Sequence, residues 1–170
     1  MISKKMEVEL NEQVNKEFFS AYMYLAMSAY CNTIGLPGFA HWMRMQYEEE
    51  NMHVTKMYDY ILNQGGEVHL KMIEEPPREY GAPMEIFQKT LEHERFITGS
   101  IHKLMEIAVE EKDYATQALL QWYVTEQVEE EANVHNILAP LRMVGGDKGG
   151  LMMIDQQLSG RPTPAPLSVK

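Results

Sequence analysis

The chain has 170 residues, with 25 acidic and 15 basic side chains and a formal net charge of -10. A chain of this length forms one domain of ordinary size around a single core. The acidic balance argues against nucleic-acid binding, because phosphates require a basic surface, and it favours a protein that attracts cations.

The cysteine content and the lengths of the apolar runs indicate where in the cell the protein is expected. Cys31 is the only cysteine, so no disulfide can form within the chain. The sequence starts Met1-Ile2-Ser3-Lys4-Lys5 with no apolar run behind it, which predicts no signal peptide. No apolar stretch reaches the roughly 18 residues that a membrane span needs. We therefore expect a cytoplasmic protein without a membrane partner.

The first part of the chain predicts two long helices. Residues from about 4 to 32 contain no Gly or Pro and carry apolar side chains at helical spacing, as an amphipathic helix does. Both helix breakers occur in the turn Ile34-Gly35-Leu36-Pro37-Gly38. A second helix is expected from about 39 to 63, ended by Gly65-Gly66.

The middle of the chain predicts an irregular connection followed by two more helices. Residues from about 65 to 82 include Pro76-Pro77, which rules out a continuous helix there. A third helix is expected from about 83 to 111. A short link at 112–113 leads to a fourth helix that ends near Val144.

The last part of the chain predicts a short helix and a tail. Gly145-Gly146 and Gly149-Gly150 bracket a break, and residues 151–158 are expected to form a short fifth helix. Residues 159–170 contain three prolines and are expected to be extended or flexible. The predicted domain therefore covers residues 1–158.

Connection lengths predict the topology. Short links make the first and second helices antiparallel, and likewise the third and fourth. The middle connection, at about 3.3 Å per residue, can run the whole length of the bundle, so the second and third helices are expected to be parallel. We therefore predict an all-α fold: a four-helix bundle with a long crossover between helices two and three, plus a short C-terminal fifth helix.

Each predicted long helix carries a carboxylate on its core-facing stripe. Glu50 and His53 are three apart, so both lie on one helical face, where they can bind the same metal ion. A single Glu-x-x-His also occurs by chance on exposed helices, so the interpretation depends on the other helices. The stripe residues, in chain order, are Glu17, Glu50, His53, Glu94, Gln127 and Glu130.

The charge of this set predicts a metal centre. Any one glutamate could lie at the core boundary and reach water, but carboxylates at matching depth on four helices favour a shared site. Unpaired buried carboxylates cost several kcal/mol each, and no Lys or Arg on these stripes is placed to neutralise them. Two divalent ions would balance four carboxylates. Carboxylates with one imidazole suit iron or manganese, and zinc less exclusively, while the lack of thiolates argues against a structural zinc site.

The two halves of the chain form a loose duplication. Glu17 precedes the Glu50/His53 pair, and Glu94 precedes the pair of Gln127 and Glu130. Di-iron carboxylate bundles carry Glu-x-x-His in both halves. Because the second half lacks the histidine, we predict an asymmetric centre, with one metal bound by the imidazole and the other held more weakly by oxygen ligands.

This pattern resembles the ferritins, specifically the haem-free bacterial and archaeal type, over residues 4–158. The resemblance implies a ferritin-like fold and assigns roles to individual residues. The implied ferroxidase ligands are Glu17, Glu50, His53 and Glu94, with the variable fourth-helix positions Gln127 and Glu130. Tyr24 matches the tyrosine beside the di-iron site, and Glu49, Glu126 and Glu129, with Glu130, match a third iron site on the inner side.

The resemblance also implies an activity and an assembly. Two iron ions per subunit, and no haem, would support oxidation of Fe(II) by dioxygen or hydrogen peroxide, with Fe(III) mineral stored inside a shell of 24 identical subunits. Two metals a few ångströms apart can share one oxidant and deliver two electrons. Animal ferritins have acidic residues that line a three-fold pore at the positions of Gln117 and Leu120. This difference argues against the usual iron-entry route through that pore.

Three alternatives remain open at this point. A haem-containing bacterioferritin would have its haem-binding methionine directly after the helix-two glutamate, where this chain has Asn51. A rubrerythrin-like peroxidase would need a second Glu-x-x-His and a cysteine-ligated iron domain, and this chain has neither. A bundle that sequesters metal without redox chemistry, or binds a partner, fits the Met- and Tyr-rich helices as well as a ferritin does. Metal content and Fe(II)-dependent oxygen uptake would distinguish the two.

Overall fold

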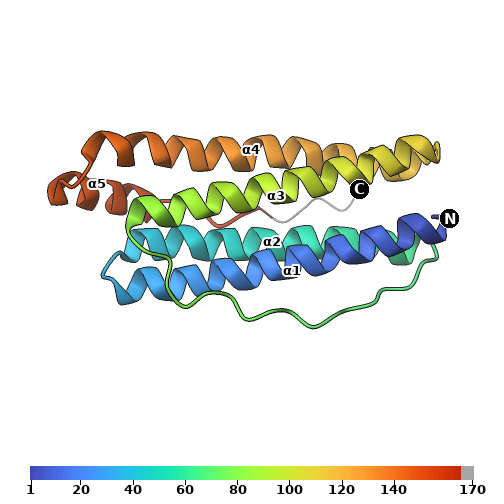
Figure 1. The fold of residues 1–170 in the computed structure, drawn as a ribbon, viewed down its shortest axis with the longest axis horizontal. Helices are drawn as coiled ribbons and strands as arrows, with labels where there is room; N and C mark the ends of the chain where they lie inside the picture. Colours follow the sequence, from blue (N-terminus) through green and yellow to red (C-terminus); the bar gives the residue numbers. More distant parts are fainter. Residues whose placement is uncertain (166–170) are drawn as a thin grey trace.

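The computed structural model describes residues 1–165, and this part of the chain consists of helices and connections without strands (Figure 1). The helices are α1 (Lys4–Thr33), α2 (Pro37–Asn63), α3 (Pro83–Glu110), α4 (Tyr114–Val144) and α5 (Lys148–Leu158). The predicted all-α fold is confirmed. Of the expected flexible tail, residues 166–170 lie outside the described range.

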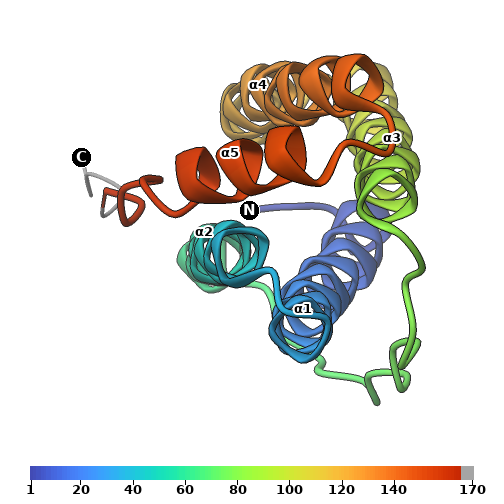
Figure 2. The same cartoon turned by 90° about the vertical axis from the view of Figure 1, so that its left-hand side faces the viewer.

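Two helical hairpins form the bundle. α1 packs along α2, and α3 packs along α4, while α5 lies across one end, against α2 and α4 (Figure 2). The two hairpins are joined across α2 and α4 by the Tyr60 and Thr116 hydroxyls, 2.8 Å apart. The connection from α2 runs back along the bundle to the start of α3 (Figure 1), so α2 and α3 are parallel and the predicted crossover is confirmed.

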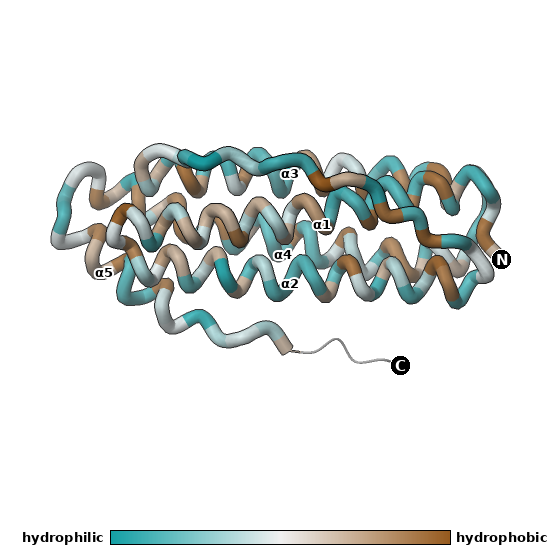
Figure 3. Tube along the Cα trace, turned by 90° about the horizontal axis from the view of Figure 1, so that it is seen from below, coloured by the Kyte–Doolittle hydropathy of each residue, from teal (hydrophilic) through white to brown (hydrophobic). Residues whose placement is uncertain are grey.

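The crossover runs along the outer side of the bundle (Figure 3), where two asparagines on α1 bind it. The Asn11 side chain donates to the Glu67 carbonyl at 2.9 Å and accepts from the His69 amide at 2.6 Å. One turn later, Asn15 donates to the His69 carbonyl at 3.1 Å and accepts from the Lys71 amide at 2.7 Å. The side chains thus satisfy backbone groups of an extended segment that has no neighbouring strand.

Helix α5 begins earlier than the sequence analysis predicted. It starts at Lys148, three residues before the expected start, and includes Gly149-Gly150, which we had expected to form a break. The Asp147 carboxylate accepts from the Gly150 amide at 2.6 Å. An aspartate at the N-cap satisfies a first-turn amide that has no partner within the helix, which offsets the low helix propensity of the glycines.

The apolar core is divided into two clusters along the bundle. One cluster lies at the end near α5 and includes Phe39, Phe87 and Leu138. The other lies at the opposite end and includes Leu10 and Ile101. On each long helix, the residues between the two clusters include buried polar side chains, so a polar layer separates the two halves of the core.

In the described part of the chain, no helix combines the length and apolar character needed to cross a bilayer.

Candidate metal centre

The polar layer contains all six stripe residues that the sequence analysis identified. All are 3% exposed or less, although they come from four different helices. They are Glu17 on α1, Glu50 and His53 on α2, Glu94 on α3, and Gln127 and Glu130 on α4. The helical periodicity therefore places their side chains at one depth, inside the bundle.

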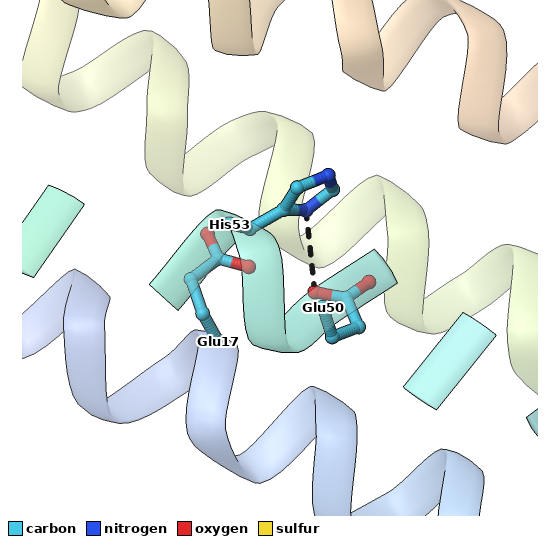
Figure 4. A group of neighbouring side chains, drawn as sticks. All are labelled: Glu17, Glu50 and His53. Atoms are coloured by element: carbon cyan, nitrogen blue, oxygen red, sulfur yellow. Dashed lines mark ion pairs between the residues drawn. The ribbon is translucent and has the colours of Figure 1, made fainter. Parts of the chain in front are cut away.

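Three of these residues meet within metal-ligand distance. Glu17, Glu50 and His53 each offer one ligand atom, and these atoms lie within 4.8 Å of one another; Figure 4 shows the three side chains converging from α1 and α2. His53 Nδ1 lies 3.4 Å from Glu50 Oε2. Glu17 Oε2 and Glu50 Oε2 are buried without a hydrogen-bond donor. Such oxygens are costly to bury unless a cation binds them.

Side chains from α4 surround His53 on its other side. The Tyr123 hydroxyl donates to the His53 carbonyl at 2.7 Å. The Trp122 ring packs edge-on against the imidazole, with the ring centroids 5.4 Å apart. These contacts restrict the α2 backbone and the imidazole ring, so His53 is held in place before any ion arrives.

Neutral donors hold the two remaining carboxylates of the layer. Glu94 accepts hydrogen bonds from the Tyr24 hydroxyl and, at 3.1 Å, from the Gln127 side-chain amide. Glu130 Oε2 accepts from the Gln46 amide at 2.9 Å. In the described part of the chain, none of the four layer carboxylates is paired with Lys or Arg. The layer therefore carries acidic groups without a protein cation to neutralise them.

Burial dominates the electrostatics of the layer. It raises the pKa values of Glu94 and, more strongly, of Glu50 and Glu130. The negative charges of Glu17 and Glu94 raise the pKa of Glu50 further, so Glu50 lies within electrostatic range of both halves of the layer. Burial also raises the pKa of Tyr24 well above its usual value, which keeps the phenol neutral and able to donate. A bound cation would relieve the same electrostatic penalty.

The acidic residues that the resemblance assigns to a third iron site lie further apart. Glu49 forms an ion pair with Arg161, with 2.6 Å between Nη2 and Oε2. Burial raises the pKa of half-buried Glu126, and nearby Glu129 and Glu49 raise it further; Glu129 itself is exposed. Among the described residues, only the group of Glu17, Glu50 and His53 brings three ligand atoms within 4.8 Å of one another.

Sequence reasoning missed the buried glutamines that contact the layer. Gln13 and Gln46 are both fully buried and donate to Glu17 and Glu130, respectively. Their spacing in the sequence could have identified them. Gln13 lies four residues before Glu17, and Gln46 lies four residues before Glu50, so each glutamine shares a helical face with a carboxylate of the layer.

The comparisons with known proteins agree with this architecture. The family model described as a ferritin-like domain matches residues 7–144. The chain belongs to the ferritin family. A bacterial non-heme ferritin from Bacteroides fragilis is 42% identical over 161 residues, covering 95% of this chain and all of that protein. One from Staphylococcus epidermidis is 38% identical, covering 95% of this chain and 97% of that protein.

Solved ferritins share the fold closely. The structure of an open-pore ferritin from the hyperthermophilic archaeon Archaeoglobus fulgidus superposes with a TM-score of 0.94 at 49% identity, covering 95% of this chain and all of that one. Within the ferritin family, the curated relatives carry the non-heme name. They favour the haem-free branch over the bacterioferritin alternative, as does Asn51 at the position where that alternative needs a methionine.

Proposed function

We propose that this ferritin stores iron: it oxidises Fe(II) with dioxygen or hydrogen peroxide at a di-iron centre inside each subunit, and the Fe(III) product is deposited as mineral inside a hollow shell. The observation that carries this proposal is the buried Glu17–Glu50–His53 group, whose unpartnered carboxylate oxygens face one another around an imidazole. Family membership supports the same function.

The first iron would be held by this group. Glu17 and Glu50 supply oxygen ligands and His53 supplies a nitrogen, a donor set that suits Fe(II). His53 Nδ1 faces Glu50, so the imidazole nitrogen and a carboxylate oxygen point toward the same space.

The second iron would be held by oxygen donors on α3 and α4. Glu94 and Glu130 supply the charge, and Gln127 lies against Glu94. Glu50 is the candidate shared ligand, because it interacts electrostatically with both Glu17 and Glu94. With no histidine in this half, the second iron would be bound more weakly than the first.

Two iron ions at this centre would supply two electrons in one event. Two Fe(II) ions become two Fe(III) ions, and the electrons reduce dioxygen to hydrogen peroxide, or hydrogen peroxide to water, with protons taken from solvent. The protein's own contribution is to position the ligands. Tyr24 donates to one oxygen of Glu94, and Gln46 donates to one oxygen of Glu130, so each carboxylate has a fixed orientation before metal binds.

The test is anaerobic addition of Fe(II) to the metal-free protein, followed by air and by measurement of Fe(III) absorbance and oxygen uptake. His53→Ala should slow fast oxidation by at least about tenfold, because loss of even an outer-shell partner of a metal costs about 10–100-fold. His102→Ala removes an exposed histidine from α3 and is the matched control. Wild-type speed in His53→Ala would refute the assignment. Metal uptake by the wild type without oxygen consumption would favour a sequestering bundle without redox chemistry.

We further propose an assembly of 24 identical subunits, as the resemblance implies, and a cytoplasmic location stays a prediction. Large apolar side chains on the bundle surface support self-association, including Tyr114 at 75% exposure and Val128 at 69%. Light scattering at micromolar concentration should give the mass of a closed shell. A monomer or dimer would argue against storage as mineral.

We also propose that a third, weaker iron site forms beside the centre, from Glu49, Glu126, Glu129 and Glu130, and acts on iron in transit to the mineral. Beyond the effect of burial, Glu129 and Glu49 raise the pKa of Glu126 further, and Glu49 does so for Glu130; this proximity of negative charges supports a cation site. Its oxygen-only ligands would hold Fe(III) better than Fe(II).

A further inference from the structure

A chain of hydrogen bonds between α1 and α3 ends on one carboxylate of the metal centre. Lys16 Nζ donates to Ser100 Oγ at 2.5 Å. The Ser100 hydroxyl donates to Gln13 Oε1 at 2.5 Å. The Gln13 side-chain amide then donates to Glu17 Oε1 at 2.7 Å. Gln13 and Glu17 are almost fully buried, whereas Lys16 is partly exposed, so the chain runs from the bundle surface to the polar layer.

The direction of every bond in this chain is determined. An ammonium group has donors and no acceptor, so Ser100 must accept from Lys16, and its own proton is free for Gln13. Because a carboxylate only accepts, the Gln13 NH₂ group faces Glu17, and the Gln13 carbonyl oxygen is left to accept from Ser100. An isolated buried glutamine could turn its amide either way, but the contacts of Gln13 with Glu17 at one end and Ser100 at the other together favour one orientation.

Gln46 provides a comparison within the same layer. It donates to Glu130 in the same manner, but its Oε1 atom is buried without a partner. The Gln46 amide is therefore held at one end only, by Glu130. Gln13 is thus the glutamine whose amide is hydrogen-bonded at both ends, and the carboxylate that it holds belongs to the Glu17, Glu50 and His53 group.

The Gln13 contact also determines which oxygen of Glu17 is available. Oε1 is occupied by the Gln13 amide, while Oε2 is buried without a donor. We propose that Gln13 is a positioning residue for the first iron, held by Ser100 and Lys16, and that it presents Glu17 as a one-oxygen ligand through Oε2. This inference rests on the proposed metal centre, since it concerns how that centre is oriented.

The test is an anaerobic titration of the full-length, metal-free protein with Co(II), followed by the visible absorption of the bound ion. Gln13→Leu removes the donor and should weaken binding of the first Co(II) by about 10–100-fold, the usual effect of losing an outer-shell partner, and should change its absorption band. Ser100→Ala should act in the same direction. Ser100→Thr keeps the hydroxyl and should restore wild-type affinity and spectrum, which a packing role alone does not predict.

Ser28→Ala is the matched control, because it removes a buried serine hydroxyl that bonds the Ala40 carbonyl, away from the layer. It should bind Co(II) as the wild type does. Wild-type affinity and spectrum in both Gln13→Leu and Ser100→Ala would overturn the inference. If Gln13→Leu does not fold, the Ser100 pair decides. If His53→Ala binds Co(II) as tightly as the wild type does, the assignment of the metal centre is wrong, and this inference is wrong with it.

Discussion

The Arg161 guanidinium lies 2.6 Å from Glu49 Oε2, joining the segment after α5 to the middle of α2. The guanidinium also stacks over the Trp42 ring at 4.5 Å and donates to the Trp42 carbonyl at 3.3 Å. The Arg161 carbonyl accepts from His41 at 2.8 Å. A cation from the chain's own C-terminal segment therefore occupies a carboxylate that the third iron site would use.

Arg161→Ala should strengthen metal binding at the third site. The variant frees Glu49, and a partly exposed ion pair contributes about 1 kcal/mol, so roughly fivefold tighter binding is expected. Titration with Tb(III), a trivalent ion that prefers oxygen ligands, would measure it through luminescence. Arg78→Ala breaks the exposed pair with Glu75 and controls for loss of a positive charge. Equal Tb(III) affinity in all three proteins would mean that Arg161 does not compete for this site.

Glu126→Ala combined with Glu129→Ala should remove the third site and leave the main centre intact. Binding of two metals per subunit should persist, because neither residue belongs to the Glu17, Glu50 and His53 group, while the ratio of iron oxidised to oxygen consumed should change. Oxygen electrode measurements at stepwise iron additions would show this. Glu106→Ala with Glu110→Ala removes two exposed acids from α3 as the control. An unchanged number of iron sites and an unchanged ratio would make the cluster an ordinary acidic surface.

Asn11→Ala should loosen the crossover. The substitution leaves the Glu67 carbonyl and the His69 amide without their partner, which should lower the free energy of unfolding by about 1–3 kcal/mol. Denaturant unfolding would measure the loss, and limited proteolysis should show faster cleavage near residues 67–71. Asn136→Ala, at an exposed position on α4, should have neither effect. Wild-type stability and cleavage in Asn11→Ala would show that the other contacts of the crossover suffice.

Local periodicity explains why most of the fold and the layer could be predicted from sequence. Glu17 lies three residues after Val14 and Glu50 four before Val54, so each carboxylate lies on the stripe that its apolar neighbours define. The same reasoning cannot assign the role of Gln13, because that role depends on a contact with Ser100, 87 positions away on α3. The start of α5 could not be predicted from periodicity either, because it depends on the side chain of one residue, Asp147, which accepts from the Gly150 amide.

The Arg161 contact lay beyond sequence reasoning for a different reason. It joins residues 112 positions apart, through a segment that follows the last helix and carries no periodic pattern. Only the path of the chain around the end of the bundle brings the guanidinium onto α2.

The polar layer divides the apolar core into two blocks, one with Phe39 and Leu138 and the other with Leu10 and Ile101. Local opening of a folded protein costs least free energy at fraying termini and mobile loops. In a subunit without bound iron, the polar layer in the middle of the bundle contains carboxylates that no cation neutralises. Local opening should therefore also begin at this layer. Iron ions bound by all four helices would join the two blocks into one cooperative unit, because ligands that bind only the folded state stabilise it. The stability of each subunit would then depend on whether iron occupies its own centre.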